Sequence, residues 1–486
     1  MADFQDRRTF IHVSLMASLG YVLVGCESQN SSKPARTNTS TPSDPRSSVT
    51  LDGLIVFRKG DERYDSLRGG FNQRIQKYPA IVVLARNTDE VATAIRHARR
   101  ERLPVAVRSG GHSFEGFSSN NDGMIVDVSL MDSFEWLSSD EQTIKVGPGL
   151  RLATLYSHLL QKNRMLPAGS CASVGIGGLT LGGGYGLFSR QWGLTCDSLI
   201  SLTLVDGNGN LRNTDDDPEL LWACRGGGNG NFGAVVSLTF KIHTAPTGLY
   251  SHRFKAYKLD SARAAKLLKL WCEIEPTLPK TTFSAFVLNG RTLTILVTDT
   301  ENTYANLQSA LKVLEKHTDK TTLGTKQDLP KALSRYYGID HPLLFKNASA
   351  GFYSGYGDIA DVFPQIAETV ATHRGMIFQV NTLGGAVANS ESEKVSAFAH
   401  RGQPFLAELQ AYYDRPSQEE KLLSGFQHVQ KLLSKAGVSR HYRNYPDINF
   451  KNWESDYYGD NYSRLQAVKQ RTDPNGRFTY AQGIRP

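Results

Sequence analysis

The sequence lacks the patterns that mark metal-binding and nucleic-acid-binding proteins. Only five of its 486 residues are cysteines, and they form neither a C-x-x-C pair nor a Cys/His cluster at the spacing of zinc ligands. Basic residues exceed acidic ones by 55 to 47, which gives a formal charge of +8, yet no run of five like charges occurs. Scattered charges are typical of a solvated surface rather than a nucleic-acid-binding stripe. We therefore expect no metal site and no nucleic-acid partner.

The composition also excludes a globally disordered or fibrous chain. Hydrophobic residues make up 40% of the chain, so it can bury the cores of two domains. The 44 glycines lack the triplet period of collagen, and they are mixed with Val, Leu, Ile and Phe, unlike those of a flexible linker. Eight glycines lie between Gly169 and Gly186, and five lie between Gly226 and Gly233. These clusters predict ordered turns where the backbone comes close to a ligand.

The first 26 residues predict an export signal. Arg7-Arg8-Thr9-Phe10 resembles a twin-arginine signal, and the apolar run that follows is shorter than the ~20 residues that span a bilayer. Leu23-Val24-Gly25-Cys26 resembles a bacterial lipobox, whose cysteine is lipidated; a buried apolar helix is the alternative. Residues 27–50 are rich in Ser, Thr, Asn and Pro and predict a disordered tether. We expect export to the cell envelope, with membrane attachment through a lipid anchor on Cys26.

A β-α-β pattern begins at residue 81. The apolar run 81–84 precedes a cap-like Thr88 and a helical pattern, and a second apolar run occupies residues 103–107. The pattern delivers Arg108-Ser-Gly-Gly-His-Ser113 at the end of a strand, where the two glycines let successive N–H groups form a nest for phosphates. The loop also presents His112, for which a turn residue bonded to backbone is the alternative.

The densest glycine segment runs from Pro167 to Gly186. No ordinary helix or strand tolerates glycine at this density, so the segment is expected to wrap closely around a flat or charged ligand. A G-x-G-x-x-G nucleotide fingerprint does not describe it, because the glycines are too many and no acidic residue follows at the expected place. The segment contains Cys171, for which a small buried hydrophobe is the alternative.

These stretches together resemble a known family of flavoproteins. The pattern is that of the proteins related to vanillyl-alcohol oxidase, and within them of the berberine-bridge-enzyme-like oxidases. The further matching stretches are Trp192–Asp197, Arg225–Gly233, Tyr442–Asp447, Tyr457–Leu465 and Asp473–Asn475. The resemblance covers nearly all of the chain after the tether. It implies an α+β fold with a two-part PCMH-type FAD-binding domain, at 51–247 and 441–486, and an antiparallel-sheet-and-helix substrate domain at 248–440.

The resemblance also implies roles for individual residues toward FAD. His112 matches the histidine joined to the flavin 8α-methyl, and Cys171 matches the cysteine joined to C6, so that FAD would be attached twice. Ile176 matches a position beside the flavin where a bulky side chain slows the access of oxygen to the flavin. Both O2 and a quinone or carrier therefore stay open as electron acceptors. The other residues expected to contact FAD are Ser109, Gly110, Gly111, Ser113, Gly175, Gly177, Gly178, Phe232, Val235 and Asn444.

The substrate half predicts strands and amphipathic helices. Asn289-Gly290 between the apolar runs 283–288 and 292–297 predicts a β-hairpin, and helical periodicity recurs at Leu307–Leu314 and Leu422–Leu433. Three more segments are expected as strands that carry polar residues. They are Met376–Asn381, Phe405–Gln410 and Tyr442–Asp447.

Strand alternation places the polar residues of the first two segments on one face each. Gln379 shares a face with Asn381, and Glu408 shares one with Gln410. A solvated sheet face is the alternative. The resemblance instead implies that Gln379 and Gln410 contact substrate and that Tyr445 removes the hydroxyl proton, with Glu408 as the second candidate base. Asn381 stands where sugar-oxidising members carry an aspartate, and Phe114 stands where tyrosine is common.

The sequence therefore predicts an FAD-dependent oxidoreductase. It would oxidise a C–OH group of a small molecule by hydride transfer to covalently bound FAD, with a sugar or oligosaccharide hemiacetal as the first candidate substrate. A phenolic or polyketide metabolite is the alternative substrate. A flavin-binding envelope protein without catalysis is the alternative of another class.

Overall fold

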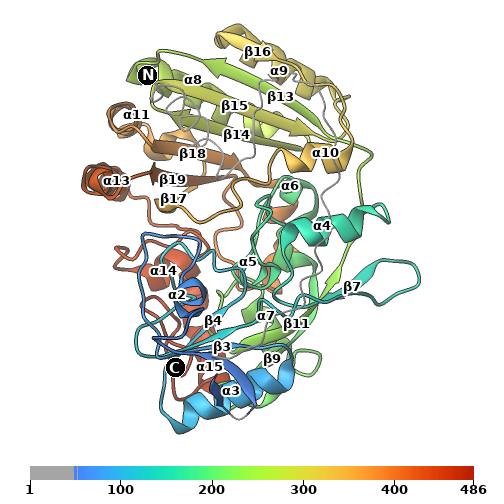
Figure 1. The fold of residues 1–486 in the computed structure, drawn as a ribbon. Coiled ribbons are helices and arrows are strands. Elements are labelled where there is room, and N and C mark those ends of the chain that lie inside the picture. The colour runs from blue at the N-terminus through green and yellow to red at the C-terminus, as the bar shows by residue number, and fades with distance from the viewer. Residues whose placement is uncertain (1–48, 52) are drawn as a thin grey trace, which may run out of the picture.

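The computed structural model describes residues 49–51 and 53–486, so the predicted export signal, Cys26 and nearly all of the tether lie outside the described residues. Two sheets form the part of the molecule that holds the N-terminal half and the C-terminal segment, and a larger sheet with its helices forms the rest (Figure 1). No helix of the described residues is both long and apolar enough to cross a membrane.

The first sheet has five strands in the order β1-β2-β3-β5-β4. Strands β3, β5 and β4 are parallel, as the β-α-β pattern predicts, and β5 lies between the other two. The strands are β1 (Val49–Leu51), β2 (Leu54–Phe57), β3 (Ile81–Leu84), β4 (Val105–Arg108) and β5 (Met124–Asp127). Helix α3 (Thr88–Arg100) covers this sheet and begins at an Asn87 cap, one residue earlier than expected.

The second sheet is antiparallel, with the order β10-β9-β11-β7-β6. Its strands are β6 (Phe134–Trp136), β7 (Thr143–Val146), β9 (Leu199–Val205), β10 (Leu211–Asn213) and β11 (Ala234–Lys241). Two short strands, β8 (Arg164–Met165) and β12 (His243–Thr244), form a separate antiparallel pair. The helices of this part are α2 (Tyr64–Arg68), α4 (Leu152–Leu160), α5 (Ile176–Leu181), α6 (Ser189–Trp192), α7 (Pro218–Cys224), α14 (Trp453–Tyr458) and α15 (Tyr462–Thr472).

The third sheet has seven antiparallel strands in the order β16-β13-β15-β14-β18-β19-β17. They are β13 (Tyr250–Ala256), β14 (Thr282–Asn289), β15 (Thr292–Asp299), β16 (Lys320–Thr322), β17 (Leu344–Tyr353), β18 (Met376–Thr382) and β19 (Phe405–Tyr413). The associated helices are α8 (Ser261–Ile274), α9 (Ala305–His317), α10 (Leu329–Ser334), α11 (Phe363–Thr372), α12 (Ser390–Lys394) and α13 (Glu419–Lys435). The predicted hairpin is confirmed as β14–β15, and both predicted helices are confirmed as α9 and α13.

Strand alternation decides what each face of the third sheet meets. Phe286 and Phe378 pack in the core cluster shared with α8, α11 and α13, whereas Ala285 and Ile377 belong to the cluster shared with the N-terminal half. Gln379 and Asn381 follow Ile377 at intervals of two residues, so they face the N-terminal half as well. Both side chains are buried, as are those of Glu408 and Gln410, so the alternative of a solvated polar face is wrong.

The segment Tyr442–Asp447 is a loop and not a strand, contrary to the prediction. Pro446 has no N–H to donate to a ladder, which prevents regular pairing at this point. The segment runs along the free edge of β17 instead, where Ser349 N–H donates to the Tyr445 carbonyl at 2.8 Å. This contact brings the C-terminal segment to the large sheet.

Candidate active site

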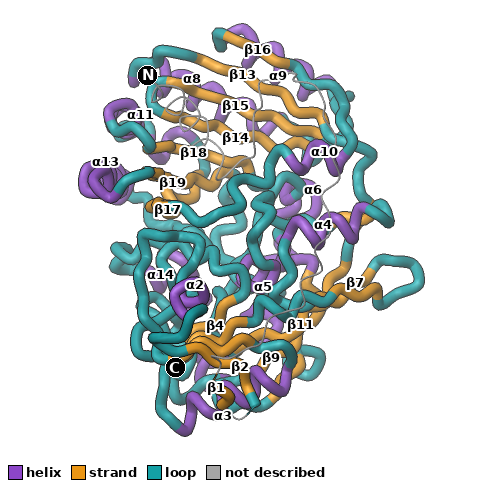
Figure 2. The backbone as a smooth tube through the Cα atoms, viewed as in Figure 1, coloured by secondary structure: helices purple, strands orange, loops and turns teal. Residues whose placement is uncertain are grey.

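A cavity of about 240 Å³ lies between the seven-stranded sheet and the N-terminal half. Much of the backbone in this middle region is loop rather than helix or strand (Figure 2). One wall comes from the loop Ser109–Phe114 and from the glycine-rich segment around Cys171, and the opposite wall comes from β17, β18 and β19. The segment Tyr442–Pro446 closes the cavity on a third side.

The glycines of the first wall are required by close packing of two loops. A Cβ atom added to Gly110 would lie 2.4 Å from the Gly175 nitrogen, and one added to Gly175 would lie 2.1 Å from the Ser109 hydroxyl. Gly111 has a φ of +72°, which an L side chain rarely adopts. Gly178 has open space at its Cβ position, apart from one contact at 3.9 Å, and faces the cavity. This cradle of exposed backbone fits a phosphate-containing cofactor.

His112 lines the cavity between the two loops of this wall. Its ring stacks on Phe71 with 4.1 Å between the ring centres, and its Nε2 lies 3.1 Å from the Ser173 hydroxyl. Burial and the nearby Arg151 guanidinium lower the pKa of His112 to about 3. The imidazole is therefore neutral at physiological pH, which is the nucleophilic form.

Cys171 lies in the same wall, two residues before Ser173. Burial raises the pKa of its thiol to about 12, and the Glu408 carboxyl contributes in the same direction. Cys171 and Glu408 both line the cavity, Cys171 from the glycine-rich segment and Glu408 from β19. The protonated thiol must lose its proton before it reacts as a nucleophile.

A chain of hydrogen bonds connects the cavity to the large sheet. The hydroxyl oxygens of Tyr185 and Tyr445 lie 2.9 Å apart, and the Asn381 amide donates to the Tyr185 hydroxyl at 3.1 Å. The Gln379 amide donates to Asn381 at 2.8 Å, and the Gln410 amide donates to Gln379 at 3.3 Å. Strand alternation thus aligns the amides of β18 and β19 behind the tyrosine pair.

Glu408 is the carboxyl group that faces the cavity from the large sheet. Burial raises its pKa to about 8, although hydrogen bonds with Gln410 and Asn347 oppose this shift. Its Oε1 accepts from the Asn347 amide at 3.3 Å, whereas its Oε2 finds no partner among the described residues. Glu408 therefore changes its protonation state near neutral pH, and one of its oxygens is left without a hydrogen-bond partner among the described residues.

The tyrosines of the site keep their protons at neutral pH. Burial raises the pKa of Tyr445 well above its ordinary value of 10, and the neighbouring Tyr185 and Glu408 act in the same direction. The Tyr445 ring also stacks on Phe114 at 5.2 Å, so the phenylalanine contributes packing where a tyrosine would add a hydroxyl. Burial likewise raises the pKa of Tyr185 well above 10. Tyr185 and Tyr445 are therefore protonated at neutral pH, and they act as hydrogen-bonding groups rather than as bases.

The structure brings most of the sequence-predicted residues to this one cavity. Tyr445, Glu408, Asn381, His112, Cys171, Ser109, Gly110, Gly111, Ser113, Gly175, Gly177, Gly178, Val235 and Asn444 all line it. Phe232 packs in the core instead, and Gln379 and Gln410 lie behind the lining as members of the amide chain. Ile176 is fully buried in the same core, whereas Val174, two residues earlier in the chain, lines the cavity.

Tyr185, Asn347 and Tyr412 are polar lining residues that were not singled out from the sequence. Tyr185 lies within the glycine-rich segment, where its position between Gly184 and Gly186 was the available signal. Asn347 and Tyr412 come from β17 and β19 and bond to each other at 2.7 Å. Strand alternation would have placed Tyr412 on the face of Glu408 and Gln410, had the predicted strand been extended by two residues.

No group of three or more His, Cys, Asp or Glu side chains within the described residues could hold a metal ion. The site instead consists of a backbone cradle, two nucleophilic side chains, a tyrosine pair and a buried carboxyl group. This arrangement can bind an extended cofactor and can exchange one proton with a ligand.

Comparisons with known proteins agree with this arrangement. A family model described as "FAD binding domain" matches residues 79–215, and one described as "Berberine and berberine like" matches residues 441–485. An uncharacterized FAD-linked oxidoreductase of Bacillus subtilis is 30% identical, with 90% of this chain and 99% of that protein covered. A chitooligosaccharide oxidase of Gibberella zeae is 26% identical, with 96% and 99% covered. The crystal structure of an aclacinomycin oxidoreductase matches with a TM-score of 0.80 and 25% identity, and covers 89% of this chain and 99% of its own.

Proposed function

Because the chain belongs to the berberine-bridge-enzyme-like family of FAD-linked oxidoreductases, we propose that it oxidises a C–OH group of a small molecule to a carbonyl. FAD supplies the two-electron acceptor for the hydride when it is bound. The observation that carries the proposal is the position of Glu408, which lines the same cavity as His112 and Cys171, has a raised pKa and keeps its Oε2 without a hydrogen-bond partner among the described residues.

One side chain removes the substrate proton, and the others hold the substrate oxygen in place. The Glu408 carboxylate takes the proton of the substrate hydroxyl as the hydride leaves the carbon, and a C=O bond forms. A base with a pKa near the working pH is the most effective one, and Glu408 meets this condition better than the neutral Tyr445. Tyr445 and Tyr185 hold the substrate oxygen in place by hydrogen bonds, and Asn381 orients Tyr185.

The cofactor is proposed to be held by the glycine cradle and by two covalent bonds. Ser109–Ser113, Gly175, Gly177 and Gly178 would contact its phosphates, and the neutral His112 and Cys171 would be joined to its ring. Each bond would form with loss of one hydrogen from the side chain and one from the flavin carbon, and the two electrons released would have to pass to an acceptor. The acceptor that closes the catalytic cycle, either O2 with formation of hydrogen peroxide or a quinone or carrier, would then complete attachment as well.

The walls near Glu408 favour an aromatic substrate over a sugar. The Asn347 amide donates to both Glu408 and Tyr412. The Tyr412 ring packs near the Phe345 ring, with 5.8 Å between the ring centres. Phe114 meets Phe345 edge-on at 5.6 Å in the same lining. Because Gln379 and Gln410 lie behind the lining, the amides expected to contact a sugar do not reach the cavity. We therefore favour a hydroxyl on a phenolic or polycyclic compound over an oligosaccharide hemiacetal.

Export to the cell envelope with a lipid on Cys26 stays part of the proposal, since the N-terminal segment lies outside the described residues. Labelling with a radioactive fatty acid in a bacterial host tests it. Incorporation that disappears in Cys26→Ala supports the anchor, and unchanged incorporation in this variant overturns it.

Anaerobic stopped-flow absorbance tests the function with the flavin-loaded protein. We expect polycyclic and benzylic alcohols to bleach the flavin, and oligosaccharides to do so more slowly. Bleaching by oligosaccharides alone would overturn the substrate class, and no bleaching by either panel would overturn the catalytic role. Peptide mass analysis after acid precipitation tests attachment: flavin released into solution, or Cys171 recovered as a thiol, would contradict the double linkage.

A further inference from the structure

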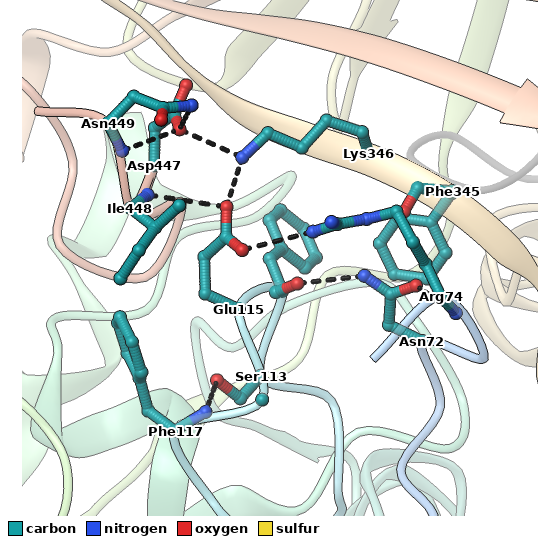
Figure 3. Close-up of polar contacts among 12 residues, drawn as sticks. Asn72, Arg74, Ser113, Glu115, Phe117, Phe345, Lys346, Asp447, Ile448 and Asn449 are labelled. Carbon is teal, nitrogen blue, oxygen red and sulfur yellow. Dashed lines mark hydrogen bonds and ion pairs between the residues drawn. The ribbon is translucent and has the colours of Figure 1, made fainter. Parts of the chain in front are cut away.

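A buried cluster of charges joins the loop at Glu115, strand β17 and the loop at Asp447 (Figure 3). None of the three charged residues lines the cavity. The centre of the cluster is Lys346 of β17, which is 4% exposed. The Lys346 ammonium forms an ion pair with Glu115 and another with Asp447, the latter at 2.9 Å. Glu115 and Asp447 are 6% and 1% exposed, so all three charges are shielded from water.

The cluster has no charge left over. Glu115 also accepts from Arg74 Nη2 at 3.0 Å, and Asp447 accepts from Asn449 N–H at 3.1 Å. Two cations therefore face two carboxylates, and each carboxylate has a second donor. Burial of such charges is costly unless every one is paired and hydrogen-bonded, so the geometry of the cluster is tightly constrained.

The two carboxylates stand close in sequence to the residues of the proposed chemistry. Glu115 follows His112 by three residues, and Asp447 follows Tyr445 by two. Neither residue lies in a helix or strand, so no backbone ladder sets the distance between the two loops. Glu115 also accepts from the Ile448 N–H at 3.4 Å, which ties the loops to each other directly.

The packing beside the cluster shows what this tie determines. Phe114, adjacent to Glu115, stacks on Tyr445 at an interplanar angle of 13°. Phe345, adjacent to Lys346, meets Phe114 edge-on, and Arg74 donates to the Phe345 carbonyl at 3.2 Å. A shift of either loop at the charge cluster would thus move the Tyr445 ring relative to the wall that carries His112.

We propose that Lys346 is a positioning residue of the oxidation, whose ammonium joins Glu115 to Asp447 and thereby fixes the distance between the His112 loop and Tyr445. The inference rests on the proposed function, because it assigns the cofactor to the first loop and the substrate hydroxyl to the second. Lys346 acts through these loops and does not itself line the cavity.

The test compares Lys346→Met with Lys346→Arg in the flavin-loaded full chain. Because a displacement of about 1 Å costs on the order of 100-fold in rate, we expect Lys346→Met to slow flavin reduction by about that factor at saturating substrate. Its visible flavin spectrum should shift, and its pH profile should differ from that of the parent. Lys346→Arg keeps the cation and should restore most of the rate, the parental spectrum and the pH profile.

Arg401→Met is the matched control, since Arg401 is a buried cation that pairs with Asp197 and neither residue lines the cavity. It should lower the melting temperature without changing the flavin spectrum or the pH profile. If Lys346→Met behaves like this control, with parental rate, spectrum and pH profile, the cluster is only structural and the proposal is overturned.

A charge-balanced variant covers the case in which Lys346→Met does not fold. Lys346→Met combined with Asp447→Asn removes one charge of each sign, and we expect it to fold with the same slow reduction and shifted spectrum. Parental rate and spectrum in this variant would overturn the positioning role. The flavin spectrum and the fraction of covalently attached flavin are measured without substrate, so they report on Lys346 even if no tested alcohol reduces the parent. Failure of every alcohol to reduce the parent would count against the proposed function alone.

Discussion

The hydroxyl groups of Tyr185 and Tyr445 lie 2.9 Å apart, although the two residues are 260 positions apart in the chain. Tyr185 comes from the glycine-rich segment and Tyr445 from the C-terminal loop, so the bond exists only after both have met at the cavity. The Asn381 amide holds the Tyr185 hydroxyl from the third side. The polar part of the site is therefore assembled from the N-terminal half, the large sheet and the C-terminal segment.

Removal of the Tyr185 hydroxyl should slow substrate oxidation. Tyr185→Phe deletes the partner of Tyr445 and leaves the Asn381 amide without an acceptor, so we expect about a tenfold lower rate of flavin reduction. Stopped-flow absorbance measures this rate. Tyr257→Phe, on an exposed tyrosine, is the control that should keep the parental rate. Equal rates in Tyr185→Phe and the parent would contradict a role for the pair.

The rate of flavin reduction should rise with pH through the pKa of Glu408. A carboxyl group with a pKa of about 8 is mostly protonated at pH 6 and mostly ionised at pH 9, and only the ionised form accepts the substrate proton. Glu408→Gln should lower the rate by at least about 100-fold and remove this pH dependence. A rate profile with the parental inflection near pH 8 in Glu408→Gln would show that another group is the base.

The same group makes the folded protein less stable at alkaline pH. In the unfolded chain the Glu408 carboxyl ionises near its ordinary value of 4.5, whereas the folded protein retains the proton up to about pH 8. The folded state thus binds more protons between these values, and stability falls as the pH rises through this window. A shift of this size corresponds to roughly 5 kcal/mol. Urea denaturation at several pH values should show a smaller decline for Glu408→Gln than for the parent, and equal declines would contradict the prediction.

Local patterns in the sequence predicted those parts of the fold that depend on neighbouring residues. Asn289-Gly290 predicted the β14–β15 hairpin, and Gly290 provides the φ of +57° that the tight turn needs. Alternation along β18 correctly placed Gln379 and Asn381 on one face, where their side chains bond each other. It could not show which face meets the N-terminal half, and the solvated alternative stayed open for this reason.

Contacts between distant segments could not be predicted in this way. Lys346 and Glu115 are separated by 231 positions, and no local pattern relates them. The segment Tyr442–Asp447 was predicted as a strand, but Pro446 cannot donate to a ladder and Ser349 N–H binds the Tyr445 carbonyl, so the segment is a loop. Likewise, the resemblance assigned Ile176 to the flavin side, whereas packing turns it into the core and leaves Val174 on the cavity wall.

Substitution of the glycine cradle should prevent cofactor binding. A Cβ on Gly110 would lie 2.4 Å from the Gly175 nitrogen, and neither backbone can retreat without separating the two loops that carry His112 and Cys171. We expect Gly110→Ala to lower stability by about 1–3 kcal/mol and to be purified with little bound flavin, measured as the ratio of visible to ultraviolet absorbance. Gly355→Ala is the control, since its Cβ would meet nothing within 4 Å and its φ is extended. A parental flavin content in Gly110→Ala would contradict this prediction. It would show that the cofactor does not depend on the close contact between Gly110 and Gly175.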